Sequence, residues 1–207
     1  FDGTITENDA SQLILDQYGE GDWKRYEGML LRGEISFESC VAYQFRLIKA
    51  SKSTILKDYD RFVEQRKGFG ALVNFANARE IPITIVSGGL DFIIREFLDR
   101  NGWSTSIGLH IGKLEDAGGR MEVTYPPLLE SGSSCFKDDL VIRLRRLGKR
   151  VIYMGDGTFD FKAARASDLA FATRGSKLAR LCRKEGVAFT EFQDFAEVVD
   201  SLAGALG

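Results

Sequence analysis

The chain has 207 residues, of which 44% are hydrophobic and 28% are charged, and its formal net charge is -2. This length and balance are typical of a globular protein with one core domain and a small insertion. The near-neutral charge excludes a strong general attraction to nucleic acid or to anionic membranes, so we expect neither as a partner.

Apolar residues recur at three- and four-residue intervals in the first third of the chain, which is the spacing of short amphipathic helices. Gly19 and Gly33 interrupt this pattern, and Ser36 is a candidate helix N-cap. Four helices without intervening strands predict a small bundle, and we assign residues 7–66 to a helical cap domain. The expected helices cover residues 11–18, 23–31, 37–49 and 54–65.

Short apolar strands alternate with helices in the rest of the chain. Runs such as residues 81–86 are typical of buried parallel strands. The alternation predicts an α/β fold, a doubly wound (Rossmann-like) parallel sheet core with the helical cap inserted after the first strand. The core domain is expected to comprise residues 1–6 and 67–207. The expected strands cover residues 81–86, 106–111, 121–125, 151–154, 169–172 and 187–189, and the expected helices cover residues 71–78, 90–100, 137–147, 161–166, 177–184 and 192–202.

The cysteines and the histidine narrow the chemistry. Cys40, Cys135 and Cys182 are odd in number and contain no CxxC pair, which argues against a disulfide framework or a structural zinc site. We therefore expect a reducing compartment and a cytoplasmic location. His110 is the only histidine, so we expect neither a multi-histidine metal site nor histidine-based acid–base catalysis. No apolar segment reaches the length of a transmembrane helix.

Polar and glycine-rich motifs lie at the expected ends of three strands. They are the FDGTIT turn at residues 1–6, the SGG sequence at 87–89 and the GDGTFD sequence at 155–160, and Lys137 begins a helix between the last two. In doubly wound sheets, ligands bind at the carboxyl ends of the strands. We therefore expect these motifs to converge if their strands are neighbours.

The converging groups predict a site for a metal ion and a phosphate. Ser87 and the Gly88 N–H can donate hydrogen bonds to a phosphate oxygen, and Lys137 supplies a positive charge. Carboxylates without histidine suit Mg²⁺, which is therefore the expected cofactor. Such an assembly is typical of phosphoryl transfer, where positioning and charge neutralisation do most of the catalytic work. The candidate metal ligands are Asp2, Asp156 and Asp160.

Each group also has an ordinary structural interpretation. SGG and GDG sequences are common in turns, an isolated lysine such as Lys137 is typical of a surface, and Asp160 can be a helix N-cap. The occurrence of all four features in order, three of them at strand ends, favours the functional interpretation.

This order of motifs resembles the haloacid dehalogenase superfamily of phosphatases, in particular its phosphoserine phosphatase-like branch. That family carries DxDGT, then a Ser or Thr after a strand, then a Lys, then GD-x₃-D. The match spans essentially the whole chain, and the resemblance implies that the helical insertion is a cap. The matching residues are 1–6, 85–89, Lys137 and 155–160.

The resemblance implies hydrolysis through an aspartyl-phosphate. Asp2 is expected to be the general acid/base, and its main-chain carbonyl is expected to bind magnesium. The nucleophile is expected to be the aspartate two positions before Asp2, outside this sequence. We therefore expect Phe1 to follow a truncated strand.

The resemblance also implies roles for the remaining motif residues. Asp156 is expected to be the side-chain metal ligand, and Asp160 a second carboxylate that holds the metal shell. Ser87, the Gly88 N–H and Lys137 are expected to clamp the phosphate, with Lys137 also part of the catalytic machinery.

Two branches of the family compete for the substrate. Three features argue against a phosphoserine phosphatase. Those enzymes carry Glu and Asn at the positions that Asp9 and Phe159 occupy here, and residues 37–43 lack the arginine expected in their cap helix. The methionine-salvage phosphatases, which act on 2-hydroxy-3-keto-5-methylthiopentenyl-1-phosphate, share the opening at residues 2–9 and the SGG-x-DF sequence at 87–92. We therefore expect that ester or a similar small phosphorylated metabolite, with Asp9 among the substrate-binding residues.

Other interpretations remain open at this stage. The chain can be a phosphoserine phosphatase, or a non-catalytic phosphate- or metal-binding module if the nucleophile is truly absent. We expect a monomer or a homodimer. The apolar cap residues can contact a methylthio-alkyl tail or form the core of the helical bundle. These residues are Trp23, Tyr26, Met29 and Phe37.

Overall fold

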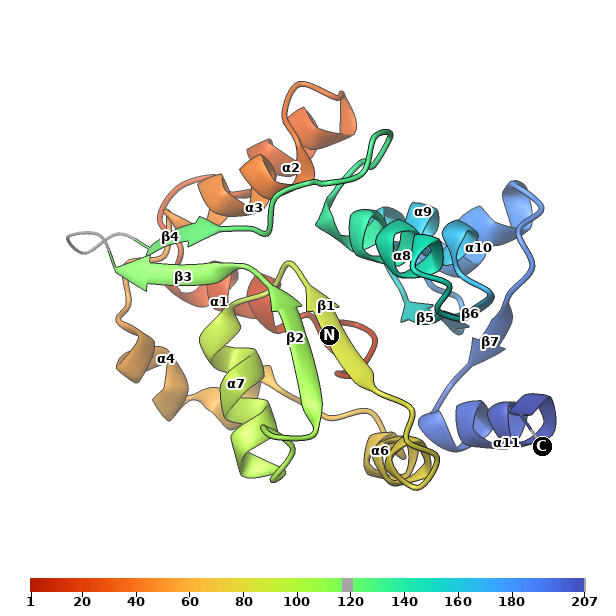
Figure 1. The fold of residues 1–207 in the computed structure, drawn as a ribbon. Coiled ribbons are helices and arrows are strands. Elements are labelled where there is room, and N and C mark those ends of the chain that lie inside the picture. Colours follow the sequence, from red (N-terminus) through yellow and green to blue (C-terminus); the bar gives the residue numbers. More distant parts are fainter. Residues whose placement is uncertain (117–120, 207) are drawn as a thin grey trace.

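A computed structural model describes residues 1–116 and 121–206 (Figure 1). Helices α1 to α11 cover Ala10–Tyr18, Lys24–Leu31, Phe37–Phe45, Lys52–Lys57, Tyr59–Phe62, Phe69–Asn77, Asp91–Arg100, Phe136–Arg146, Phe161–Ala166, Lys177–Lys184 and Phe195–Leu206. Strands β1 to β7 cover Ile83–Ser87, Ile107–Ile111, Lys113–Asp116, Met121–Thr124, Ile152–Gly155, Leu169–Thr173 and Thr190–Phe192. A short 3₁₀ helix, η1, covers Thr158–Asp160.

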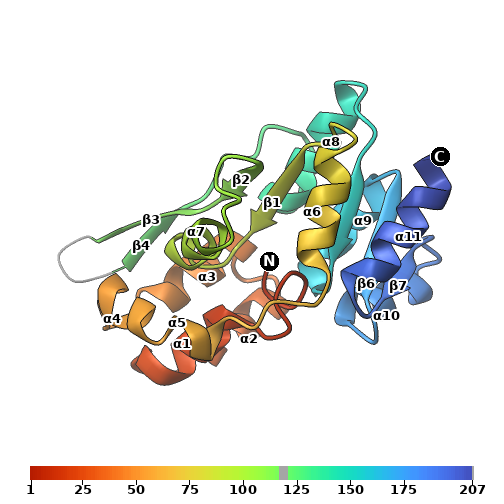
Figure 2. The same ribbon diagram turned by 90° about the horizontal axis from the view of Figure 1, so that it is seen from below.

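Two groups of parallel strands form the α/β core. Strand β1 pairs with β2, with Ile83 opposite Ile107, and β5, β6 and β7 form a second sheet in that order. Helices α9 and α10 pack on β6, whereas α11 contacts β7 and lies beside α6 (Figures 1 and 2). The structure thus confirms the predicted α/β class with parallel strands and surrounding helices. Such sheets bury both faces, which explains why their strands read as continuous apolar runs.

An aromatic cluster packs helices α6, α7 and α11 against one another. The ring of Phe69 on α6 lies 6.1 Å from that of Phe97, 5.3 Å from that of Trp103 and 5.1 Å from that of Phe195. Phe1 joins the cluster through an edge-to-face contact of 5.2 Å with Phe97. Aromatic pairs in this geometry add about 0.5–1.5 kcal/mol each beyond the area they bury. The turn that carries Asp2 is therefore attached directly to the core.

Helices α1 to α5 gather on one side of the molecule (Figure 2). The chain enters and leaves this segment at one point, because Thr6 forms an antiparallel bridge with Gln65. On the other side of the helices, the hairpin of β3 and β4 contacts α3 through β4. The segment that we assigned to a cap is thus joined to the rest of the chain by two adjacent crossings.

Two predicted helices of this segment are wrong in length. In place of one helix over residues 54–65 there are two short helices, Lys52–Lys57 and Tyr59–Phe62, because the backbone at Asp58 leaves the helical conformation with φ -100° and ψ 15°. At this break the Asp58 carboxylate accepts a 2.6 Å hydrogen bond from the Tyr18 hydroxyl of α1. Helix α3 ends at Phe45, well before residue 49, and Ile48 pairs with Gly19 in a second bridge.

Three further elements differ from the prediction. The sequence did not indicate β3, which forms an antiparallel hairpin with β4. Residues 187–189 are not a strand; β7 is Thr190–Phe192, where the fully buried Phe192 pairs with Thr173 of β6. The last helix begins at Phe195, and its first amide donates to the carbonyl of Lys67. These boundaries depend on pairing partners distant in sequence, which local patterns do not specify.

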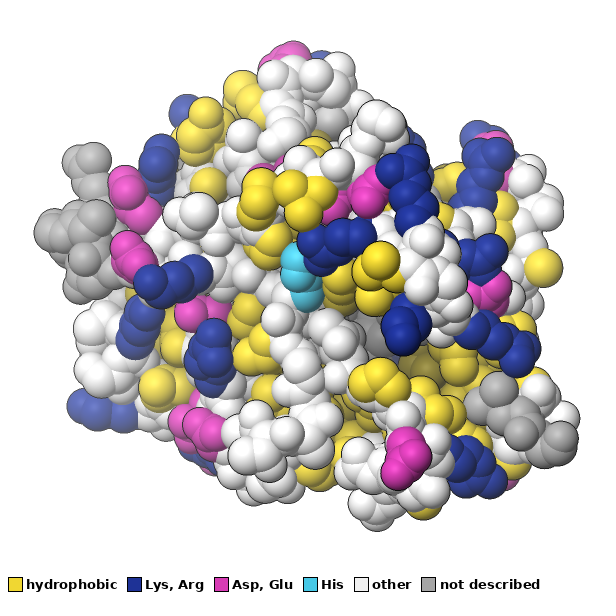
Figure 3. All heavy atoms as spheres, viewed as in Figure 1, with side chains coloured by type: hydrophobic (Ala, Val, Ile, Leu, Met, Phe, Trp, Pro, Cys, Tyr) yellow, Lys and Arg dark blue, Asp and Glu magenta, His cyan; other side chains and the backbone are white. Residues whose placement is uncertain are grey.

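The surface of the described residues carries mixed charges. Figure 3 shows basic and acidic side chains interspersed with apolar ones over the face drawn there. Within residues 1–116 and 121–206, no helix combines the length and apolar character needed to cross a membrane.

Candidate active site

A cavity of about 610 Å³ opens where the Asp2 turn, the ends of β1 and β5 and the first helices meet. Its walls include polar groups from the two parallel sheets and side chains of α1, α2 and α3. The structure brings every site residue that the sequence predicted to this cavity. These residues are Asp2, Asp9, Ser87, Gly88, Lys137, Asp156 and Asp160.

The carboxylate of Asp2 faces the start of α1. Its Oδ1 accepts a 3.0 Å bond from the Ala10 N–H, and its Oδ2 accepts a 3.3 Å bond from the Ser11 hydroxyl. Burial raises the pKa of Asp2 above its ordinary value. A Cβ on Gly89 would lie only 2.5 Å from Asp2 Oδ2 and 3.2 Å from the Ser87 hydroxyl. The absence of a side chain at Gly89 thus lets Asp2 approach the end of β1.

Asp156 lies against the Asp2 turn. The Thr4 hydroxyl donates a 2.8 Å bond to Asp156 Oδ1. Gly3 has φ +69°, and a Cβ there would lie 2.5 Å from Asp156 Oδ2, so only glycine suits this position in both conformation and space. Burial, followed by the nearby charge of Asp160, raises the pKa of Asp156.

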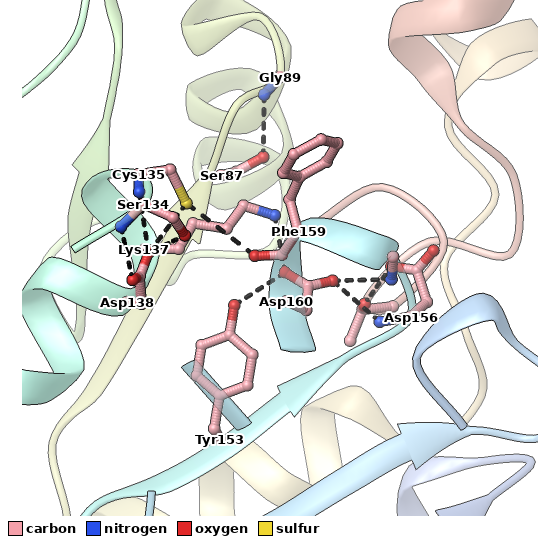
Figure 4. A network of polar contacts seen from close by, with 12 residues as sticks. Ser87, Gly89, Ser134, Cys135, Lys137, Asp138, Tyr153, Asp156, Phe159 and Asp160 are labelled. Carbon is pink, nitrogen blue, oxygen red and sulfur yellow. Dashed lines mark hydrogen bonds and ion pairs between the residues drawn. The ribbon is translucent and has the colours of Figure 1, made fainter. Parts of the chain in front are cut away.

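Asp160 is surrounded by hydrogen-bond donors (Figure 4). Its Oδ1 accepts from Lys137 Nζ at 2.7 Å and from the Tyr153 hydroxyl at 2.8 Å. Its Oδ2 accepts from the N–H groups of Asp156 at 3.1 Å and Gly157 at 2.8 Å. Although burial alone would raise the pKa of Asp160, the charge and hydrogen bond of Lys137 lower it to about 2. The carboxylate therefore remains ionised and holds the loop that carries Asp156.

Lys137 extends from the first turn of α8 into the cavity. Only 14% of its side chain is exposed. Burial opposes its charged form, yet the Asp160 carboxylate raises the pKa of Lys137 above the ordinary value. Its ammonium also lies 5.5 Å from the ring centre of Phe37 on α3. Lys137 thus presents a permanent positive charge in a sheltered place.

Ser87 and Gly88 end β1 at the cavity wall. The Ser87 hydroxyl accepts a 3.0 Å bond from the Gly89 N–H, and the Gly88 carbonyl accepts a 2.6 Å bond from the Tyr125 hydroxyl. A Cβ on Gly88 would lie 2.7 Å from Cζ of Phe37, so the α3 aromatic ring covers this turn directly. The turn after β1 is therefore held by the Tyr125 hydroxyl and covered by the Phe37 ring of α3.

Asp9 caps α1 rather than pointing freely into the cavity. Its Oδ1 accepts a 2.9 Å bond from the Gln12 N–H. Burial, followed by the charge of Asp2, raises the pKa of Asp9 to about 7. The structure places Asp9 on the cavity wall, and its carboxylate also serves as a helix N-cap.

Among the polar residues at or next to the cavity that the sequence motifs did not indicate, Tyr153, Glu38 and Arg66 hold its parts together. Tyr153 supports Asp160 from within β5. Glu38 of α3 accepts a 3.0 Å bond from the N–H of Phe136, the first residue of α8. Arg66 donates hydrogen bonds to the main-chain carbonyls of Gly3 and Thr4 in the Asp2 turn. The contacts of Glu38 and Arg66 join residues far apart in the chain, so no local motif indicates them. Tyr153 lies close to Asp160 in sequence but stands within a buried strand, outside the GDGTFD motif.

The donor set decides which metal ion suits the site. Among the described residues, no group of three or more His, Cys, Asp or Glu side chains is arranged to hold a metal. Asp2 and Asp156 nevertheless supply oxygen donors around the Gly3 turn, and within residues 1–116 and 121–206 no hydrogen bond reaches Asp156 Oδ2. Asp160 differs, because all of its acceptor positions face protein donors. The arrangement fits a hard cation held by few side-chain ligands together with main-chain carbonyls or water.

Comparison with curated proteins reveals relatives that match nearly the whole chain. One, from Exiguobacterium sibiricum, is 28% identical over 98% of this chain and 93% of its own length. Another, from Geobacillus kaustophilus, is 30% identical over 98% of this chain and 92% of its own length. Both are named 2-hydroxy-3-keto-5-methylthiopentenyl-1-phosphate phosphatase.

Solved structures support the same fold. A substrate-bound phosphoserine phosphatase superposes with a TM-score of 0.72 at 18% identity, covering 97% of this chain and 94% of its own. A phospho-aspartyl intermediate analogue of phosphoserine phosphatase gives the same TM-score, 0.72. The model of the haloacid dehalogenase-like hydrolases matches residues 1–165. The resemblance inferred from the motifs is thereby confirmed, and the chain belongs to the haloacid dehalogenase-like hydrolases.

Proposed function

We propose that the protein is a Mg²⁺-dependent phosphatase that hydrolyses a small phosphate monoester through an aspartyl-phosphate intermediate. The observation that carries this proposal is the convergence, on one cavity, of the Asp2 and Asp156 carboxylates with Ser87, Gly88 and Lys137. Negative groups for a cation and donors for a phosphate meet there as phosphoryl transfer requires.

The cation would be held by the side chain of Asp156 and the main-chain carbonyl of Asp2. When bound, Mg²⁺ neutralises the charge of the phosphate oxygens. We assign Asp160 a supporting role, because its carboxylate is already saturated by Lys137, Tyr153 and two loop amides. It positions the Asp156 loop and leaves direct binding of the ion to Asp156.

The nucleophile in this proposal is the aspartate expected two positions before Asp2. Its attack on phosphorus forms the aspartyl-phosphate and breaks the bond to the ester oxygen, which takes a proton from Asp2. Asp2 then accepts a proton from the water that hydrolyses the intermediate. The raised pKa of Asp2 favours this role, because burial makes the carboxyl hold more readily a proton that it can then donate.

Ser87, the Gly88 N–H and Lys137 would hold the phosphate during both steps. Lys137 is suited to this because its charge is sheltered and fixed by Asp160. A positive charge in a sheltered cavity interacts more strongly with a phosphate than the same charge in water does.

We propose 2-hydroxy-3-keto-5-methylthiopentenyl-1-phosphate, or a similar uncharged-tail ester, as the substrate. The names of the full-length relatives support it. So does the cavity, because Arg66 is the one Lys or Arg of described residues 7–66 that lines it, and its guanidinium already binds main-chain carbonyls. A phosphoserine carboxylate would require a cationic partner that is available to it. Apolar groups of the helical segment are available for the tail. They include Leu15, Leu30, Val41 and Phe45.

We further propose that residues 7–66 act as a cap over a core made of residues 1–6 and 67–207. The two crossings meet at the Thr6–Gln65 bridge, which is a suitable hinge. A cap that closes over the cavity would exclude bulk water and strengthen the charge interactions within.

The test is a screen of phosphate esters with the full-length protein in the presence of Mg²⁺ or of a chelator. We expect Mg²⁺-dependent release of phosphate, fastest from the methylthiopentenyl ester. Selective hydrolysis of phosphoserine would favour the alternative substrate. Binding of Mg²⁺ and phosphate without any turnover would instead identify a non-catalytic module.

A further inference from the structure

Arg66 is a buried arginine that the proposed mechanism does not use. The residue is only 5% exposed and follows the Thr6–Gln65 bridge, where the chain returns from the helical segment. A buried guanidinium is unfavourable unless its donors find partners, so its contacts indicate what it does.

The guanidinium binds four main-chain carbonyls. Its Nε donates to the carbonyl of Thr4 at 2.8 Å, and Nη2 donates to those of Gly3 at 3.0 Å and Thr6 at 3.4 Å. Its Nη1 donates to the Gln193 carbonyl, between β7 and α11, at 3.0 Å. One rigid planar group thus joins the Asp2 turn to the far edge of the second parallel sheet.

The backbone N–H and the charge of Arg66 make two further contacts in this region. Its N–H donates a 2.8 Å bond to the carbonyl of Ile5. Its Nη1 lies 2.7 Å from Glu7 Oε2, which balances the buried charge from the solvent side. The contacts therefore satisfy both the donors and the charge of the side chain.

These contacts lie next to Asp2 and Asp156, the two carboxylates on which the proposed reaction depends. Gly3 follows Asp2 directly, and the Thr4 hydroxyl donates to Asp156. A shift of the Gly3 and Thr4 carbonyls would move both Asp2 and the support of Asp156. Loss of productive geometry by about 1 Å is enough to reduce turnover roughly 100-fold.

We propose that Arg66 is a positioning residue that fixes the Asp2 turn for catalysis. The proposal rests on the proposed phosphatase function, although its structural part can be measured independently. Lysine at this position would keep the charge, but its ammonium lacks the planar fork that reaches several carbonyls at once.

The experiment compares Arg66→Lys with the full-length wild type. Arg100→Lys is the matched control, because Arg100 binds Glu96 and Asp60 at the surface. Hydrogen–deuterium exchange measures the order of the turn, where the N–H groups of Ile5 and Thr6 donate to the Phe1 carbonyl. Steady-state kinetics with a phosphate monoester separates kcat from KM.

For Arg66→Lys we expect faster exchange in peptides that cover the Asp2 turn and unchanged exchange in β6. We also expect kcat to fall roughly 10- to 100-fold while KM stays within about twofold. Arg100→Lys should match the wild type in both measurements. Unchanged turn exchange or an unchanged kcat in a folded Arg66→Lys protein would overturn the proposal.

Glu7→Gln is the second variant, in case Arg66→Lys does not fold. It retains the carbonyl contacts of Arg66, so kcat should stay within about threefold of the wild type. A loss of tenfold or more would show that the ion pair, and not the carbonyl fork, is what matters, and would refute the proposal. If the wild type hydrolyses no ester while Arg66→Lys still loosens the turn, the phosphatase function fails and the holding of the turn by Arg66 stands.

Discussion

The ammonium of Lys137 donates to Asp160 Oδ1 across 2.7 Å, in a contact where 14% and 6% of the two side chains are exposed. The pair joins the start of α8 to η1, at the end of β5. Because Asp160 also accepts from the N–H groups of Asp156 and Gly157, the pair connects the charge of Lys137, which we propose binds the phosphate, to the loop that we propose binds the metal. Removing either partner should therefore affect stability as well as chemistry.

Asp160→Asn should destabilise the fold in a pH-dependent way. The native pKa of Asp160, about 2, lies below the ordinary 3.8, so its stabilisation is present above pH 3.8 and is lost as the pH falls towards 2. We expect the wild type to exceed Asp160→Asn by about 2 kcal/mol in free energy of unfolding near neutral pH. Urea unfolding between pH 2.5 and 7 measures the difference.

Asp60→Asn is the control for this measurement, because Asp60 pairs with Arg100 while its own side chain is 88% exposed. Its effect should be small, about 0–1 kcal/mol. A gap between wild type and Asp160→Asn that stays constant from neutral to acid pH would contradict the ionised state of Asp160.

Asp156→Ala should abolish the metal response. Its carboxylate is the described side chain best placed to bind the ion, so we expect loss of both Mg²⁺-dependent turnover and Mg²⁺ binding, the latter measured by titration calorimetry. Asp200→Ala, which changes an exposed aspartate on α11, should retain both. Normal Mg²⁺ affinity in the Asp156→Ala protein would exclude this residue as a ligand.

The sequence specifies the site better than the arrangement that supports it. Asp2, Ser87 and Asp156 were predictable because parallel strands bring their carboxyl ends to one edge, and each residue is in a recognisable motif. Arg66 was not, because its partners are backbone carbonyls of residues 3–6 and 193, which carry no side-chain signature. The same reason explains Glu38, whose partner is a main-chain N–H on α8.

Helix lengths in the first third show the same limit. Apolar periodicity predicted one helix over residues 54–65, but the bond from Tyr18 to Asp58 coincides with a break there. Residues 187–189 resemble a strand in composition, whereas the strand is set by pairing of the next three residues with β6. Tertiary partners override local propensity in both cases.

Ser87 and Lys137 should contact the same phosphate. A complex with phosphate or a fluoride analogue should place one anion within ~2.6–3.2 Å of the Ser87 hydroxyl and of Lys137 Nζ. Ser87→Ala should weaken inhibition by inorganic phosphate roughly tenfold, by loss of a hydrogen bond to a charged group. An anion bound elsewhere, with these two side chains apart, would refute the clamp. Ser106→Ala, at an exposed serine before β2, is the matched control and should not change inhibition.

Trp23 and Phe37 should behave differently, although the sequence grouped them as apolar cap residues. Trp23 is 7% exposed, and its Nε1 donates a 3.0 Å bond to Asp16 on α1, as expected of a residue in the helical bundle. Trp23→Ala should cost about 3–5 kcal/mol of stability, measured by urea unfolding. Little loss of stability, together with altered ester preference, would instead assign Trp23 to substrate binding.

Phe37 covers the predicted phosphate clamp, which consists of Ser87, Gly88 and Lys137. Its ring lies 5.5 Å from Lys137 Nζ and 4.9 Å from the ring of Phe159, and it closes over Gly88. Every ester presents the same phosphate there, so Phe37→Ala should lower kcat/KM for all esters by a similar factor, because water then reaches the clamp. Comparison of kcat/KM over a panel of esters measures this.

Val41→Ala is the counterpart of that test. Val41 lies on α3 and also lines the cavity, where it is available to contact the variable tail of the ester. Removing its methyl groups should change the ratio of kcat/KM between a methylthioalkyl phosphate and a shorter alkyl phosphate by roughly 3- to 10-fold, the effect of one or two buried methylene groups. If Phe37→Ala shifts this ratio and Val41→Ala does not, the tail lies beside Phe37, and the division between a common clamp and a selective cap wall is wrong.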